Sequence, residues 1–123
     1  MLVTLFKQSR VENSMDDRSA YVALNMIEGI GPVTVRSLVD TLGSAAAVFG
    51  AEPGVLKGVP GLGPAVLQTL LHQRDTVPWQ AEMEKAENSG IRILTPLDDE
   101  YPRPLKEIHD PPLVLYVRGR FET

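Results

Sequence analysis

The chain has 123 residues, of which 43% are hydrophobic and 23% are charged, and its net charge is −4. These proportions are those of one ordinary globular domain or two small ones. The chain has no cysteine, which excludes disulfides and thiolate chemistry and predicts a cytoplasmic protein. No apolar run is long enough to span a membrane, and no basic-then-apolar signal peptide opens the sequence, so we expect no membrane partner.

Neither half of the chain is basic. Residues 1–75 carry six Lys or Arg against seven Asp or Glu, and residues 76–123 carry six against nine. A domain that binds nucleic acid by itself usually has a basic surface, so the charge disfavours strong autonomous DNA binding. A helix N-terminus can nevertheless bind a phosphate without a lysine.

The sequence predicts three parts. Residues 1–18 are expected to form a flexible N-terminal tail, residues 19–76 a helical domain, and residues 77–123 the opening of an α/β domain. Met15 stands directly before a typical helix start, so it is an alternative to Met1 as the native first residue.

The first predicted helix covers residues 19–27, because apolar residues recur there on one face at helical spacing. Its candidate N-caps are Asp16, Asp17 and Ser19. The helix ends at Gly29, and a second helix begins at Pro32, a residue suited to the first helical turn. Apolar residues at i, i+3, i+4 and i+7 from Val35 give this second helix an apolar face.

A second copy of the pattern follows. Short helices are predicted over residues 45–49 and 53–57. Residues 60–64, Pro-Gly-Leu-Gly-Pro, then repeat the layout of residues 28–32 at an offset of 32 positions, and an apolar helix follows them. The two copies predict a tandem helix–hairpin–helix unit of five helices, a mainly α fold of the SAM-like type.

The pattern changes after residue 77. A helix is predicted from Trp79 to about Gly90, a strand at 91–94, a helical turn at 104–108 and a second strand at 113–117. The last segment is a continuous apolar run, typical of a strand buried on both faces of a parallel sheet. Two strands joined by a crossover predict the start of a Rossmann-like α/β fold.

The two Gly-apolar-Gly turns predict phosphate binding. Their glycines leave the backbone bare, and the apolar residue between them plugs into the core. The helix that follows points its unpaired N–H groups and positive dipole end outward, where a phosphate can accept hydrogen bonds. Such a contact positions the nucleic acid without reading its sequence. The predicted DNA-binding residues are Gly29, Ile30, Gly31, Val33, Thr34 and Arg36 in the first turn, and Gly61, Leu62, Gly63 and Ala65 in the second.

Plain turn chemistry is the alternative for both hairpins. The first hairpin has Thr34 and Arg36 beside it, whereas the only cation near the second is Lys57. We therefore expect DNA contact mainly at the backbone amides after Gly31, with Arg36 in support.

Catalytic and metal-binding patterns are not evident. His72 and His109 are isolated, and the acidic run at residues 98–100 is more typical of a turn or a helix cap than of a cation site. No glycine-rich phosphate loop joins a strand to a helix. We expect no enzyme activity, no cofactor and no metal.

The segment from Gly90 to Gly119 resembles a known family. The residues that carry the resemblance are Gly90-Ile91, Leu94-Thr95, Asp98, Tyr101-Pro102, Leu105, Ile108, Asp110, Pro112, Leu115-Tyr116 and Gly119. They look like the region that leads into the nucleotide-binding-like fold of the DNA processing protein family DprA, also called Smf. The tandem hairpins resemble the N-terminal domain of that family.

The resemblance implies a role in DNA recombination. DprA proteins bind incoming single-stranded DNA during natural transformation of competent cells, protect it and load the RecA recombinase onto it. They use a Rossmann fold both for DNA binding and for forming a homodimer. The family's Gly-Ser-Arg motif would come just after Gly119 and is absent, so no residue of that pocket is carried over and the chain is expected to be an N-terminal fragment.

A second class of function stays open. A five-helix bundle with purely structural hairpins would be a protein-interaction or packing module with no DNA binding of its own, and the negative charge favours it.

Overall fold

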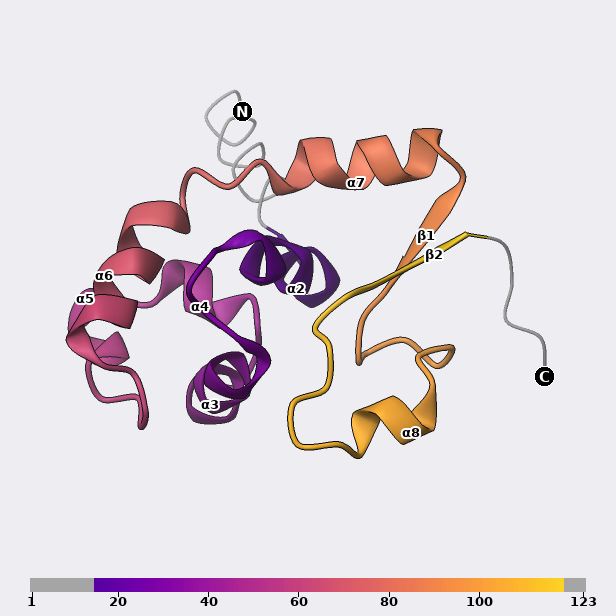
Figure 1. Ribbon diagram of the computed structural model, residues 1–123. Helices are drawn as coiled ribbons and strands as arrows, with labels where there is room; N and C mark the ends of the chain where they lie inside the picture. The colour runs from indigo at the N-terminus through magenta and orange to yellow at the C-terminus, as the bar shows by residue number, and fades with distance from the viewer. Residues whose placement is uncertain (1–14, 119–123) are drawn as a thin grey trace, which may run out of the picture.

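The computed structural model describes residues 15–118, and the predicted tail up to residue 14 and the family position Gly119 lie outside them. Figure 1 shows helices followed by a pair of strands. In chain order the elements are α2 (Asp17–Met26), α3 (Pro32–Leu42), α4 (Ala47–Gly50), α5 (Pro53–Leu56), α6 (Pro64–Gln73), α7 (Trp79–Asn88), β1 (Ile91–Leu94), α8 (Arg103–Lys106) and β2 (Leu115–Arg118).

Helix α2 is the centre of the molecule. The carboxylate of Asp16 accepts a 2.8 Å hydrogen bond from the Ser19 amide, which caps the first turn as predicted. The helix begins at Asp17, so residues 17 and 18 belong to it rather than to the predicted tail, because Asp16 takes the capping role. Its buried residues occur on several sides, at Ser19, Ala20, Val22, Ala23 and Leu24. A helix buried on more than one side is expected to lie between other elements, and α2 does so (Figure 1).

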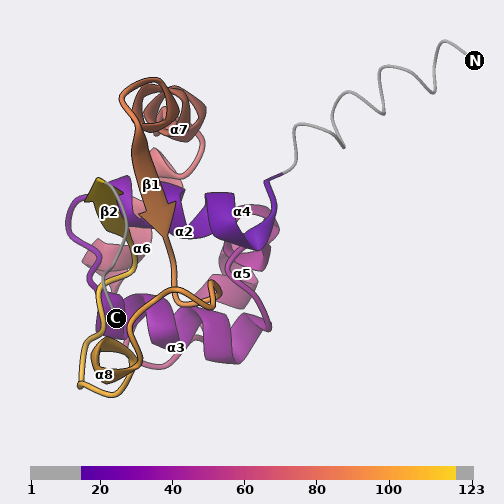
Figure 2. The ribbon, with the colours of Figure 1, turned by 90° about the vertical axis from the view of Figure 1, so that its right-hand side faces the viewer.

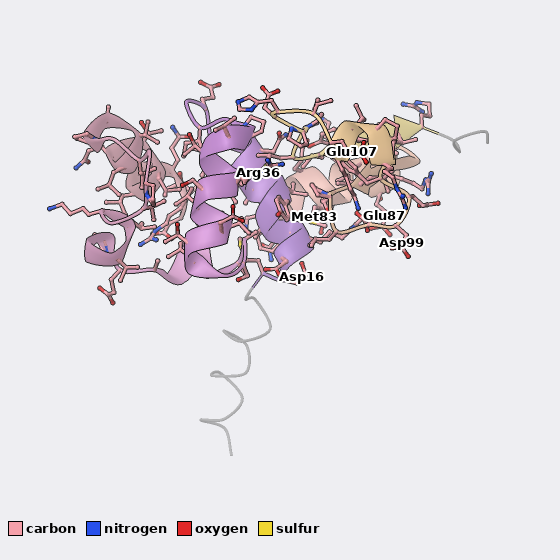
Figure 3. All side chains as sticks on the ribbon, turned by 90° about the horizontal axis from the view of Figure 1, so that it is seen from below. Asp16, Arg36, Met83, Glu87, Asp99 and Glu107 are labelled. Atoms are coloured by element: carbon pink, nitrogen blue, oxygen red, sulfur yellow. The ribbon has the colours of Figure 1, made fainter. Side chains whose placement is uncertain are left out.

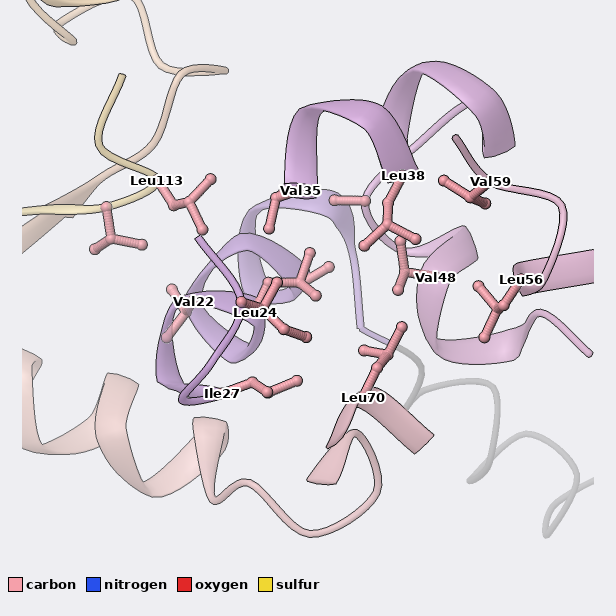
Figure 4. Packing of buried hydrophobic residues seen from close by; sticks show 14 of the residues in the cluster. Val22, Leu24, Ile27, Val35, Leu38, Val48, Leu56, Val59, Leu70 and Leu113 are labelled. Atoms are coloured by element: carbon pink, nitrogen blue, oxygen red, sulfur yellow. The ribbon is translucent and has the colours of Figure 1, made fainter. Parts of the chain in front are cut away.

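The five helices α2 to α6 enclose one apolar core. Leu24 from α2, Leu38 from α3, Val48 from α4, Leu56 from α5 and Leu70 from α6 are all fully buried and meet there (Figure 4). Burying a large aliphatic side chain contributes about 1.5–3 kcal/mol to folding. The predicted mainly helical tandem is confirmed.

Arg74 joins two of these helices. Its Nη1 donates to the carbonyls of Val48 and Ala51 at 2.8 and 2.9 Å, so the end of α6 satisfies the unpaired carbonyls at the end of α4. The Arg74 guanidinium therefore has a structural role, linking α6 to α4.

The two strands pair antiparallel, from Ile91 opposite Arg118 to Leu94 opposite Leu115. The prediction of a parallel sheet with a second strand buried on both faces is wrong, because α8 is a single turn and cannot form a full crossover. Residues of β2 alternate between half-buried and exposed, so neither face of this strand is fully buried; Figure 2 shows it lying beside β1. A Rossmann-like continuation stays a prediction.

The strands pack on the helical unit. Ile93, Leu113 and Val114 belong to the same apolar cluster as the helical core. Arg18 at the start of α2 bonds the carbonyl of Ile93 and pairs with Asp98 at 3.4 Å. The described residues therefore share one continuous core.

Within residues 15–118, no helix combines the length and the apolar character that crossing a membrane requires.

Candidate nucleic-acid interface

Hairpin 1, residues 27–32, connects α2 to α3. Gly29 has a φ of +93°, a left-handed conformation that L side chains rarely adopt. Ile30, at 8% exposed, enters the core as predicted. Gly31 is the N-cap of α3 and is extended, with φ −102° and ψ 178°. The turn is therefore fixed by one left-handed glycine and one apolar anchor.

The start of α3 leaves backbone donors outside the helical hydrogen-bond ladder. The first bond of that ladder runs from the Val35 amide to the Gly31 carbonyl at 3.0 Å. Pro32 has no N–H, so the amides of Val33 and Thr34 are the donors that precede the ladder. Gly31 has no side chain that could cap them, and Val33 is 48% exposed. This helix end can accept an anion.

Hairpin 2, residues 59–64, repeats this geometry before α6. Gly61 has a φ of +83°, and Gly63 is an extended N-cap without a side-chain cap. The Leu67 amide bonds the Gly63 carbonyl at 2.9 Å, which leaves Ala65 and Val66 ahead of the ladder. Leu62 is only partly buried, so hairpin 2 is anchored less deeply than hairpin 1.

One hydrogen bond and one close approach relate each hairpin to the helix that follows the other. The Oγ of Ser37 on α3 donates a 2.6 Å hydrogen bond to the carbonyl of Pro60 in hairpin 2. A Cβ placed on Gly29 in hairpin 1 would lie 3.6 Å from Cγ2 of Thr69 on α6. Ser37 and Thr69 are separated by the same 32 positions as Gly29 and Gly61, so equivalent residues of the two helices face the opposite hairpin, although the positions they face differ by one in the repeat. The helix that follows each hairpin therefore lies next to the other hairpin.

The charge around the hairpins is sparse. Arg36 projects from α3 one turn after Pro32, and it forms no salt bridge with another described residue (Figure 3). Glu28, exposed at the edge of hairpin 1, opposes it in sign, and Lys57 is the exposed cation that precedes hairpin 2. Backbone amides are therefore the main donors of this surface, with Arg36 as the cation nearest to hairpin 1 in sequence.

The acidic run at residues 98–100 is a structural turn. Asp98 accepts a 2.7 Å bond from the Thr95 amide, and Glu100 pairs with Arg92 at 2.5 Å. No group of three potential metal ligands occurs among residues 15–118. The interpretation of this run as a turn is confirmed.

Sequence reasoning missed Ser37 and Thr69 as the residues that couple the hairpins. Serine and threonine are both tolerated at half-buried helix positions, so neither residue stands out in the sequence of its helix. An alignment of the two repeats would have indicated them, because it places a hydroxyl side chain at the same position in both.

A family model for the SAM-like helix-hairpin-helix tandem matches residues 21–73. The chain is also 32% identical over 107 residues to Protein Smf from Synechocystis sp., covering 86% of this chain and 27% of that protein. A DNA ligase from Kocuria rhizophila is 33% identical over 88 residues, covering 71% of this chain and 11% of the ligase.

The Holliday junction branch migration complex subunit RuvA from Desulforudis audaxviator is 32% identical over 85 residues, covering 63% of this chain and 42% of that subunit. No solved structure matches the chain significantly. The chain thus spans less than half the length of each of these three relatives. The similarity confirms the predicted family resemblance: the chain is a relative of the DprA/Smf proteins, and its residues 21–73 form a SAM-like helix-hairpin-helix tandem.

Proposed function

We propose that the chain is the DNA-contacting part of an Smf-like DNA-processing protein and that it binds the DNA backbone without sequence preference. One observation carries the proposal: the N-termini of α3 and α6 both lack a side-chain cap, and the Ser37–Pro60 hydrogen bond ties α3 to the hairpin that precedes α6. The amides of Val33 and Thr34 would donate to a phosphate oxygen, and Arg36 would add a charge. Hairpin 2 would hold a second phosphate more weakly through Ala65 and Val66.

The finer parts of the proposal rest on the family resemblance. The bound DNA would be single-stranded, and the whole protein would act in natural transformation. It would deliver the DNA to RecA and would dimerise through a further Rossmann-like domain. The role is one of binding rather than catalysis, and it would be exercised in the cytoplasm.

The second candidate function is packing or protein interaction. The exposed apolar side chain of Val33 at hairpin 1 and the net charge of −4 favour it. In this case the hairpins would be helix connectors, and the chain would bind no oligonucleotide.

The test uses Gly31→Asp. The backbone of Gly31 is extended, and a Cβ there meets nothing within 4 Å, so the variant should fold. Aspartate is a favoured N-cap that engages the same amides, and its carboxylate repels a phosphate. We expect Gly31→Asp to retain or raise stability while weakening single-strand binding about ten-fold, in line with losing a charged hydrogen bond worth roughly 1.5 kcal/mol.

Gly50→Asp is the matched control, because Gly50 is exposed, open around its Cβ and outside both hairpins. Fluorescence anisotropy with a labelled oligonucleotide at low and moderate salt measures the binding. Salt-sensitive binding that is unchanged in Gly50→Asp and about ten-fold weaker in Gly31→Asp supports the proposal. Equal binding by both variants removes hairpin 1 as the site.

A further inference from the structure

A cavity of about 260 Å³ opens where α3 faces the segment after β1. The rings of Pro32, Pro96 and Pro111 and the phenol of Tyr21 form much of its wall, and Arg36 and Lys106 are its cations. Pro32 is the first residue of α3, so the cavity begins where hairpin 1 ends. Figure 1 shows the segment that joins α8 to β2 running on the side of α8 that faces α3.

The two cations are available to a ligand. Arg36 comes from α3 and Lys106 from α8, both are exposed, and neither forms a salt bridge with another residue between 15 and 118. The Nζ of Lys106 lies 6.0 Å from the centre of the Tyr101 ring, at the outer limit of a cation–π contact. Two cations from segments far apart in sequence therefore converge on one cavity.

The cavity also contains one carboxylate, that of Asp40, one turn after Arg36. Tyr21 is half-buried, and its pKa is raised first by burial and then by the charges of Asp17 and Asp40. Its hydroxyl is therefore a neutral hydrogen-bond donor at physiological pH. The cavity therefore combines apolar walls with the cations of Arg36 and Lys106 and with the carboxylate of Asp40 as a hydrogen-bond acceptor.

We propose that this cavity receives one unpaired nucleotide of the DNA strand whose backbone lies on hairpin 1. The base would lie against the prolines and Tyr21, and its phosphate would be held between Arg36 and Lys106. Bases stack on aromatic side chains with little regard to sequence. The volume is just below the range of about 300–1,000 Å³ typical of small-molecule pockets, which suits one base rather than two.

The inference rests on the proposed DNA binding and adds a consequence for strandedness. A base in a duplex cannot leave its stack without an energetic cost, whereas an unpaired base enters freely. The cavity would thus give the chain a preference for single strands that the hairpins alone do not supply.

The experiment uses a single-stranded oligonucleotide with one 2-aminopurine, whose fluorescence reports on the surroundings of that base. Lys106→Gln removes a cavity cation that lies outside both hairpins, and Lys85→Gln removes an exposed cation of α7 as the matched control. We expect Lys106→Gln to weaken binding about two- to five-fold, as for an exposed ion pair, and to lower the salt slope by about one. It should also reduce the fluorescence change at saturation, whereas Asp40→Asn should strengthen binding.

The possible outcomes separate the two proposals. If Gly31→Asp weakens binding about ten-fold while Lys106→Gln matches Lys85→Gln in affinity and fluorescence, the hairpin site holds and the cavity site is wrong. If the wild-type chain binds no oligonucleotide, the proposed function is wrong, and free deoxyadenosine monophosphate then tests the cavity by amide chemical shifts. Shifts at Tyr21 and Val39 would support the nucleotide site, and unchanged spectra would overturn it.

Discussion

The hydroxyl of Ser37 donates to the carbonyl of Pro60 at 2.6 Å, and through this bond the helix of one hairpin holds the loop of the other. The equivalent residue Thr69 lies beside Gly29, where an added Cβ would meet its methyl group. The Ser37–Pro60 hydrogen bond restrains the spacing of the two helix N-termini. Under the proposed function, this spacing would place the two phosphate sites on one surface.

Ser37→Ala should loosen that coupling. The lost hydrogen bond lies at the surface, so we expect a decrease of about 0.5–1 kcal/mol in the free energy of unfolding, measured with urea. Amide chemical shifts of residues 60–63 should move with it. Unchanged stability together with unchanged shifts in hairpin 2 would show that the bond does not hold the loop.

Gly29→Ala should cost more than Gly31→Ser, although both residues lie in one hairpin. Gly29 has a φ of +93°, and forcing an L residue into that region costs roughly 1–2 kcal/mol. Gly31 is extended, and serine there can cap α3, so the second variant should be neutral or slightly more stable. Equal unfolding midpoints for the two variants would contradict this difference.

Removing the Asp16 cap should destabilise the protein in a pH-dependent way. Hydrogen bonds from Ser19, the backbone amide first, lower the pKa of Asp16 below its ordinary value of 3.8. Because the folded pKa is the lower one, the stabilisation is present above pH 3.8 and is lost as the pH falls through the folded value. Asp16→Ala should therefore cost about 1 kcal/mol at pH 7, and less in acid.

Asp16→Asn is the control for that prediction, since asparagine also caps helices but does not titrate. Urea unfolding at pH 7 and at pH 3 measures all three proteins. A wild-type advantage over Asp16→Asn that does not shrink in acid would contradict the assigned cause.

Tyr116 should make the protein sensitive to alkali. Burial, and then the hydrogen bond and charge of Glu82, raise the pKa of Tyr116 from 10.0 to about 12. The folded pKa is the higher one, so this stabilisation is present below pH 10 and is lost as the pH rises towards 12. The stability advantage of wild type over Tyr116→Phe should shrink across that interval in urea unfolding. A constant difference would exclude the coupling between Tyr116 and Glu82.

The elements that could be predicted from the sequence are those fixed by local chemistry. Asp16 predicts the start of a helix by its capping side chain. Gly29 predicts a turn and Pro32 the first turn of the next helix, independently of the tertiary contacts. The direction of β2 could not be predicted in this way. The apolar run from Leu113 to Val117 is compatible with a parallel or an antiparallel strand. The path of the chain after Thr95 decides which of the two forms.

The candidate site was predictable in its backbone and not in its side chains. The repeat located both helix N-termini, because their glycines and prolines recur at a fixed offset. The cavity beside hairpin 1 joins Arg36 to Lys106, which lie 70 positions apart, and no local pattern indicates that they meet.

The most direct test of the central claim is to titrate the isotope-labelled chain with a single-stranded oligonucleotide and follow each amide by NMR. Phosphate binding at the hairpins predicts that the amides of Val33 and Thr34 move most, that those of Ala65 and Val66 move less, and that Gly50 does not move. Saturable shifts confined to other surfaces, or no shifts at low salt, would contradict the claim and leave the hairpins as helix connectors.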